Sequence, residues 1–149
     1  MQRYVSMLVI AAVTALTATV ASSFEPGQWY ASLAKPDWTP PNWLFGPVWS
    51  VLYVMIAIAG WLVWRAQGLG LALFVWLAGL CLNAAWSYLM FGQNNIEAAM
   101  IDLGLLWVAI VVFILAARRV SGGAALLFVP YLAWVSFAGA LNFAILQLN

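Results

Sequence analysis

Long apolar runs without charge alternate with short polar breaks along the whole chain. A helix that crosses a membrane needs about 20 mostly apolar residues, and each run is long enough to cross once. The pattern predicts an all-α membrane protein, a bundle of five transmembrane helices that forms a single domain over residues 1–149. The predicted spans are 4–22, 45–64, 70–91, 97–117 and 124–147, with a long loop at 23–44 between the first two.

Composition supports a membrane protein and excludes several classes of function. Hydrophobic residues make up 67% of the 149 residues and charged residues only 6%, against roughly 25% charged in soluble domains. The chain has no histidine and a single cysteine, Cys81, so it lacks the side chains for a His-based catalytic pair. We therefore expect no metal site. The net charge of +1 and the lack of a basic patch predict no nucleic-acid partner.

The first apolar run has a second interpretation as a secretory signal peptide. Arg3 precedes the run and small residues surround Ala21, as in such signals. However, the run is longer than the roughly 7–15 apolar residues typical of a signal, which favours a permanent helix. Ala11, Ala15 and Thr19 recur at every fourth position, which predicts close packing of this helix in the bundle.

Basic residues are divided unequally between the two membrane faces. With five spans, Arg3, Arg65, Arg118 and Arg119 lie on one face and Lys35 lies on the other. Because the distribution of Lys and Arg sets orientation, the N-terminus is predicted to be cytoplasmic. The helical build and this charge bias favour a bacterial cytoplasmic membrane over an outer membrane.

The segment KPDWTPPNWLFGPVW (35–49) combines four prolines with three tryptophans. Proline fixes φ, lacks a backbone donor and restricts the residue before it, so the segment is predicted to be a stiff loop. One interpretation is a connector whose Trp38 and Trp43 anchor at the level of the lipid headgroups. The other is a lid over a cavity among the helices.

Polar residues inside the third and fourth predicted helices are candidates for function. Asn83 and Trp86 share one helix face, where Asn83 either bonds to another helix or serves as the polar handle of a pocket walled by Trp86. Asp102 lies within the fourth helix, where an ionisable group is a functional candidate. Glu97 has a structural interpretation, because Asn94 as the N-cap would place it at N3 of a capping box.

The last helix carries two stripes of residues on different faces. Trp134, Ala138 and Leu141 recur at i, i+4 and i+7, as either a core face or the wall of a cavity. The second stripe consists of small residues suited to close helix contact, Ser136, Ala140 and Ala144. The small-residue stripes of the first and last helices are also compatible with a homodimer.

In combination, these motifs resemble the translocator protein family, also called tryptophan-rich sensory proteins or peripheral-type benzodiazepine receptors. The matching pieces stand in the family's order and cover nearly the whole chain. They are WY (29–30), the segment 35–49, LNAAW with FG (82–92), Asp102 and PYLAWVSFAGALN (130–142). The resemblance implies a five-helix bundle with an internal pocket, capped by the first long loop, for flat hydrophobic ligands.

The resemblance also implies a function, with porphyrins such as protoporphyrin IX as ligands and membrane lipid as the surroundings. The implied role is a membrane receptor or sensor that regulates tetrapyrrole metabolism or a stress response. Alternatives are light-dependent degradation of protoporphyrin, for which Trp49 and Trp134 match the implicated tryptophans, and transport of porphyrin or sterol. The implied pocket residues are Tyr30, Trp38, Trp49, Asn83, Trp86, Trp134, Ala138 and Leu141.

The chain departs from the family pattern in ways that bear on the ligand. Phe143 and Gln147 occupy the tyrosine and basic positions of the family's sterol motif, so we do not expect sterol binding. Ala98 replaces a tryptophan found in some animal members. Lys35 is either ordinary surface charge or a partner for a porphyrin propionate. Without histidine, a metal-free porphyrin is the simpler ligand, and no cofactor is required.

Overall fold

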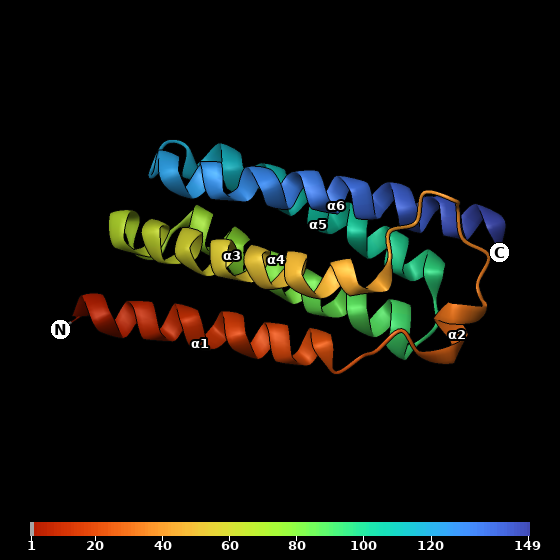
Figure 1. Cartoon of the computed structure of the whole chain (residues 1–149). Coiled ribbons are helices and arrows are strands. Elements are labelled where there is room, and N and C mark those ends of the chain that lie inside the picture. The colour runs from red at the N-terminus through yellow and green to blue at the C-terminus, as the bar shows by residue number, and fades with distance from the viewer. Residues whose placement is uncertain (1) are drawn as a thin grey trace.

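The structure is a computed structural model that describes residues 2–149, with side chains from residue 4 onward. The described chain is helical and contains no strand, and five of its helices are long and apolar enough to cross a membrane, which confirms the predicted fold class. Figure 1 shows these five helices side by side. In chain order the elements are α1 (Gln2–Ser22), α2 (Gly27–Ser32), η1 (Asn42–Leu44), α3 (Phe45–Gln67), α4 (Leu71–Ser87), η2 (Tyr88–Gly92), α5 (Ile96–Ala117) and α6 (Gly122–Leu148).

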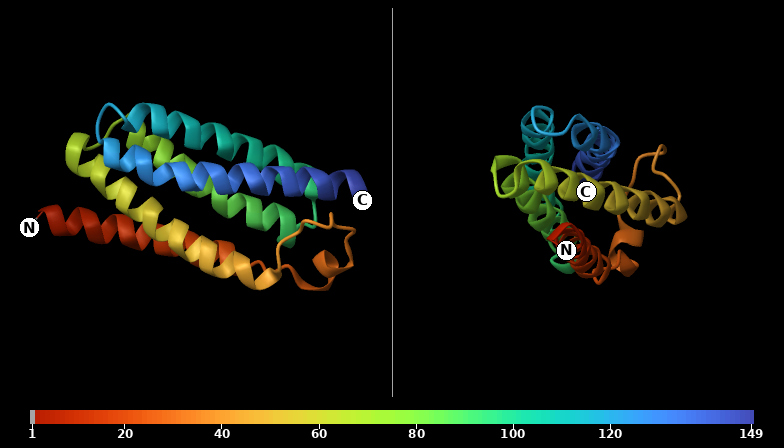
Figure 2. Two further views of the ribbon diagram at one scale, coloured as in Figure 1. Left: turned by 45° about the horizontal axis from the view of Figure 1, so that its top comes forward. Right: turned by 90° about the vertical axis from the view of Figure 1, so that its left-hand side faces the viewer.

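The five long helices form a closed ring. Helix α1 packs on α3 and α4, α3 packs on α6, α6 packs on α5, and α5 packs on α4. The view along the bundle in Figure 2 shows this arrangement end-on. The two ends of the chain lie at opposite ends of the bundle, as an odd number of spans requires, and α2 with its flanking loops lies at the end away from the N-terminus (Figure 1).

A close approach of α3 and α4 depends on one glycine. The indole of Trp76 lies against Gly60, and its Nε1–H donates to the carbonyl of Ile56 at 2.8 Å. A methyl group at position 60 would lie 2.5 Å from the ring, closer than non-bonded carbons approach. A side chain at this position would therefore displace the indole or separate the two helices.

The small-residue stripe of α6 packs in part, since the indole N–H of Trp107 on α5 donates to the Ser136 hydroxyl at 2.8 Å, whereas the stripe of α1 is exposed, contrary to the prediction. The buried face of α1 instead carries Ser6, Ile10 and Thr14, and the Thr14 hydroxyl donates to the carbonyl of Ile10 at 2.8 Å. The exposed members of the two stripes are Ala11, Ala15, Thr19, Ser136 and Ala140, whereas Ala144 is half-buried.

At the junction of α4 and α5 the predicted N-cap residue, Asn94, is wrong. Helix α4 continues into the π-helical turn η2, where the amide of Gln93 donates to the carbonyl of Tyr88. Asn94 then takes a left-handed conformation (φ 52°), which an N-cap residue does not have. Asn95 is the N-cap, since its side chain accepts from the amide of Ala98 at 2.9 Å. Glu97 therefore lies at N2, and the expected capping box does not form.

Candidate functional site

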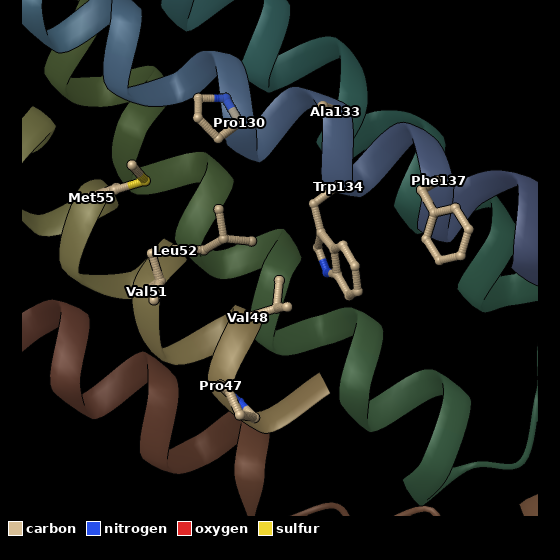
Figure 3. Close-up of a pocket in the computed structure, with 9 residues that line it drawn as sticks. All are labelled: Pro47, Val48, Val51, Leu52, Met55, Pro130, Ala133, Trp134 and Phe137. Carbon is tan, nitrogen blue, oxygen red and sulfur yellow. The ribbon is translucent and has the colours of Figure 1, made fainter. Parts of the chain in front are cut away.

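A groove of about 590 Å³ opens between α3 and α6. This volume lies within the roughly 300–1,000 Å³ of typical small-molecule sites, and the groove is walled almost entirely by apolar side chains. Figure 3 shows the two rows of side chains facing each other. The lining residues are Pro47, Val48, Val51, Leu52 and Met55 from α3, and Pro130, Ala133, Trp134 and Phe137 from α6.

A proline lines the groove on each side. Pro47 lies in the first turn of α3, where the missing amide donor has no helical partner to lose. Pro130 lies inside α6, where it removes one hydrogen bond from the helix. Membrane helices tolerate such a proline because neighbouring groups compensate for the lost bond.

Trp134 provides the polar feature of this groove. Its ring packs edge-on against Phe45 and tilted against Phe137, with centroid distances of 5.7 and 5.5 Å. Its Nε1 atom is buried and has no hydrogen-bond partner among the described residues. An unpaired N–H in an apolar setting is unfavourable, and a bound acceptor would satisfy it. The groove therefore has apolar walls, and one residue of its lining carries a buried donor without a partner.

The loop between α2 and η1 reaches this groove through Trp38. The Trp38 ring contacts the ring of Phe137 edge-on, with centroids 5.8 Å apart, and half of the residue remains exposed. Trp43 is 72% exposed and lies outside the groove lining. The two tryptophans thus differ: the position of Trp38 suits a lid, and that of Trp43 suits a headgroup anchor.

Asn83 takes part in hydrogen bonds that join three helices. Its Oδ1 accepts from the Tyr53 hydroxyl on α3 at 2.6 Å, and its Nδ2 donates to the Tyr131 hydroxyl on α6 at 2.9 Å. Trp49 lies beside both tyrosines, with ring centroids at 5.7 Å from Tyr53 and 6.3 Å from Tyr131. The observed geometry corresponds to interhelical bonding by Asn83, the first of its two predicted alternatives.

Tyr30, Trp86 and Leu141 belong to a second cluster; they do not line the groove, although the lining residue Phe137 packs against this cluster. Phe91 contacts the rings of Tyr30 and Trp86 edge-on, with both centroid distances at 5.5 Å. Trp86 donates from Nε1 to Oδ1 of Asn142 at 3.3 Å. This cluster fastens the loop end of the bundle, because it joins α2, α4, η2 and α6.

The ammonium group of Lys35 is engaged within the loop. Its Nζ donates to the carbonyls of Leu33 at 3.1 Å and Ala31 at 3.4 Å, and lies 4.7 Å from the ring centroid of Tyr30. Burial raises the pKa of the Tyr30 phenol. A propionate would have to compete with these contacts, so Lys35 is foremost an organiser of the loop.

Sequence reasoning found part of this site and missed other residues. Trp134 alone of the eight predicted pocket residues lines the groove, and Ala138 packs against the main core. Asp102 is buried, and its Oδ2 has no partner among the described residues, but it does not line the groove. The other eight residues that line the groove were missed, as were Phe45, Tyr53 and Tyr131 beside it. Tyr53 and Tyr131 had a usable signal, since hydroxyls within membrane helices usually point at a partner.

Fold and groove together define a class: a small multi-pass helical membrane protein with a lateral apolar groove partly covered by an aromatic loop. Residues 6–148 match the TspO/MBR family, and the chain belongs to this family. It is 45% identical over 130 residues to the tryptophan-rich protein TspO of Chlorobaculum tepidum, covering 84% of this chain and 82% of the relative.

Two further relatives extend the comparison. The chain is 34% identical to the tryptophan-rich sensory protein of Cereibacter sphaeroides, over 89% of this chain and 84% of that one. It is 38% identical to the human translocator protein, over 87% and 82% of the two chains. Family membership and the names of these relatives support a membrane sensor or regulator.

Proposed function

We propose that this protein binds protoporphyrin IX or a similar flat tetrapyrrole in the groove between α3 and α6, and reports its level to tetrapyrrole metabolism. The observation that carries the proposal is Trp134, a tryptophan in an apolar groove with a buried, unpartnered Nε1–H. A porphyrin offers two large apolar faces and polar groups at its edge. The groove supplies the complementary surfaces, and the indole N–H supplies a donor for an edge acceptor.

The two walls of the groove favour a flat ligand. Val48, Leu52 and Met55 from α3 face Trp134 and Phe137 from α6 across the opening (Figure 3). An aromatic contact adds about 0.5–1.5 kcal/mol beyond the burial of apolar area. The chain has no histidine for iron, so we propose the metal-free porphyrin rather than haem.

We also propose that the N-terminus is cytoplasmic. Arg65 lies in the last turn of α3, and Arg118 and Arg119 lie in the turn between α5 and α6, at the end of the bundle where α1 begins (Figure 1). Lys35 lies at the opposite end, while the Arg3 side chain is outside the described residues. An excess of basic residues marks the cytoplasmic face. A reporter that is active only outside the cytoplasm, fused after Leu148, tests this orientation.

Tryptophan fluorescence quenching by protoporphyrin IX in detergent tests the binding proposal. Trp134→Phe keeps an aromatic ring but removes the donor, so we expect saturable binding to weaken about tenfold, or about 1.4 kcal/mol. Trp134→Leu also removes the ring and should weaken binding further. Trp43→Phe is the matched control, because it removes an exposed tryptophan outside the groove. Linear quenching that is equal in all variants would mean that porphyrin only partitions into micelles, and would refute the proposal.

Illumination of the bound complex separates binding from degradation. Trp134 would lie directly against a porphyrin in the groove, whereas Trp49 is not among the lining residues. New products that depend on Trp134 would favour the degrading alternative. Bleaching identical to that of free pigment would leave binding as the function.

A further inference from the structure

We propose that the side-chain amide of Asn149 is a latch that holds the loop 33–38 against α6, and that this latch sets how fast a ligand enters and leaves the groove. The second half of this inference rests on the proposed porphyrin-binding function. The first half concerns the loop alone and can be tested without a ligand.

The latch consists of one amide group with three hydrogen bonds. Oδ1 of Asn149 accepts from the backbone N–H of Ala34 at 3.0 Å, and Nδ2 donates to the carbonyl of the same residue at 2.9 Å. Nδ2 also donates to the carbonyl of Ile145 at 2.8 Å. The bond to Ile145 fixes the amide on the last turn of α6, so that its remaining groups point at the loop.

The loop depends on such a side chain because its own backbone is poor in donors. Pro36, Pro40 and Pro41 have no N–H to offer. Among the described residues, the other hydrogen bonds of residues 33–41 connect groups no more than four residues apart. The two bonds to Asn149 instead join positions 115 residues apart. They are therefore the polar tie between this loop and the helix bundle.

The latch acts on the groove through Trp38. Four residues beyond Ala34, the Trp38 ring contacts Phe137, which lines the groove. Release of Ala34 leaves this part of the loop held chiefly by a half-exposed ring contact. Asn149 does not line the groove, so we expect it to keep the same partners when a ligand binds. A group with equal interactions in both states changes rates but not the equilibrium.

Two variants of the full-length protein test the latch. Asn149→Ala removes the amide and its volume, and Asn149→Leu removes the amide but keeps a side chain of similar size. Leu148→Ala is the control, because it truncates an exposed neighbour outside the latch. Hydrogen exchange of the loop in detergent, without porphyrin, reports the latch. Stopped-flow quenching by protoporphyrin IX reports the rates of ligand binding and release.

In both Asn149 variants we expect faster hydrogen exchange of the Ala34 amide. We also expect the rates of porphyrin binding and release to rise about tenfold each, with the Kd changed by less than about twofold. Unchanged exchange would overturn the latch. Faster hydrogen exchange with unchanged rates of porphyrin binding and release would overturn the gating role. So would a faster release rate with an unchanged binding rate, because the Kd would then weaken. If the wild type shows no saturable porphyrin binding, the proposed function and the gating role both fall, while the exchange data still decide whether Asn149 holds the loop.

Discussion

Gly60→Ala is the substitution expected to disturb the bundle most directly. A Cβ atom at position 60 would lie 2.5 Å from Cε2, 2.7 Å from Nε1 and 2.8 Å from Cζ2 of Trp76. The indole has no room to move aside, because Trp76 is only 3% exposed and its Nε1–H is bonded to the carbonyl of Ile56. The added methyl group must therefore push α4 away from α3 or force the indole to give up this hydrogen bond.

Three effects set the size of the destabilisation. Overpacking a tight core costs about 1–3 kcal/mol. Loss of the Trp76 hydrogen bond adds about 1 kcal/mol. Alanine is favoured over glycine inside a helix by about 0.5–1 kcal/mol, which offsets part of the loss. We expect Gly60→Ala to lower the free energy of unfolding by about 2 kcal/mol.

Unfolding by SDS in mixed micelles, followed by near-UV circular dichroism, measures this loss. Gly79→Ala is the matched control, because a Cβ atom there meets nothing within 4 Å. We expect the control to be as stable as the wild type or more stable by about 0.5–1 kcal/mol. If Gly60→Ala unfolds at the same SDS concentration as the wild type, or if both glycine variants lose the same stability, the contact between Gly60 and Trp76 is not a main determinant of stability.

Two further predictions use the same unfolding assay. Asn83→Ala leaves the hydroxyls of Tyr53 and Tyr131 without their partner, so we expect a loss of about 1–2 kcal/mol, and Tyr53→Phe should lose about half as much. If Asn83→Ala unfolds at the same SDS concentration as the wild type, the interhelical role of Asn83 is refuted. Burial raises the pKa of the Tyr30 phenol above its ordinary value of 10.0. Around that pH the unfolded state loses the phenol proton first, so stability should fall as pH rises through 10 toward the raised pKa of the folded state. The stability of Tyr30→Phe should fall less steeply with pH than that of the wild type, and equal slopes for the two proteins would contradict the prediction.

Much of the architecture was predictable because membrane spans are recorded locally in the sequence. An apolar run of about 20 residues crosses once, wherever its partners are. Periodicity also identified the inward face of the last helix, where Trp134 and Ala138 are half-buried and Leu141 is buried. The loop between the first two spans followed only in part from its prolines. Residues 33–41 are not helical, but α2 lies within the predicted loop 23–44, and the segment 35–49, expected to be a stiff loop throughout, is helical from residue 42 onward.

Two local predictions failed for identifiable reasons. The N-cap of α5 moved from Asn94 to Asn95 because α4 continues into a π-helical turn, a feature with no clear sequence signal. Ala11 and its stripe face outward because small residues at every fourth position predict a close contact but not its partner. A lipid-facing and a helix-facing alanine look alike in an apolar helix.

The sequence by itself determined the number of membrane-spanning helices and the family. Only the tertiary structure decided which side chains meet. It pairs Asn83 with two tyrosines, places the unpartnered indole N–H of Trp134 in a groove between α3 and α6, and brings Asn149 to Ala34. Hydropathy and spacing report whether a residue is buried, because burial repeats with the helix period. They carry no information about which helix lies opposite, and the chemistry of the site depends on that pairing.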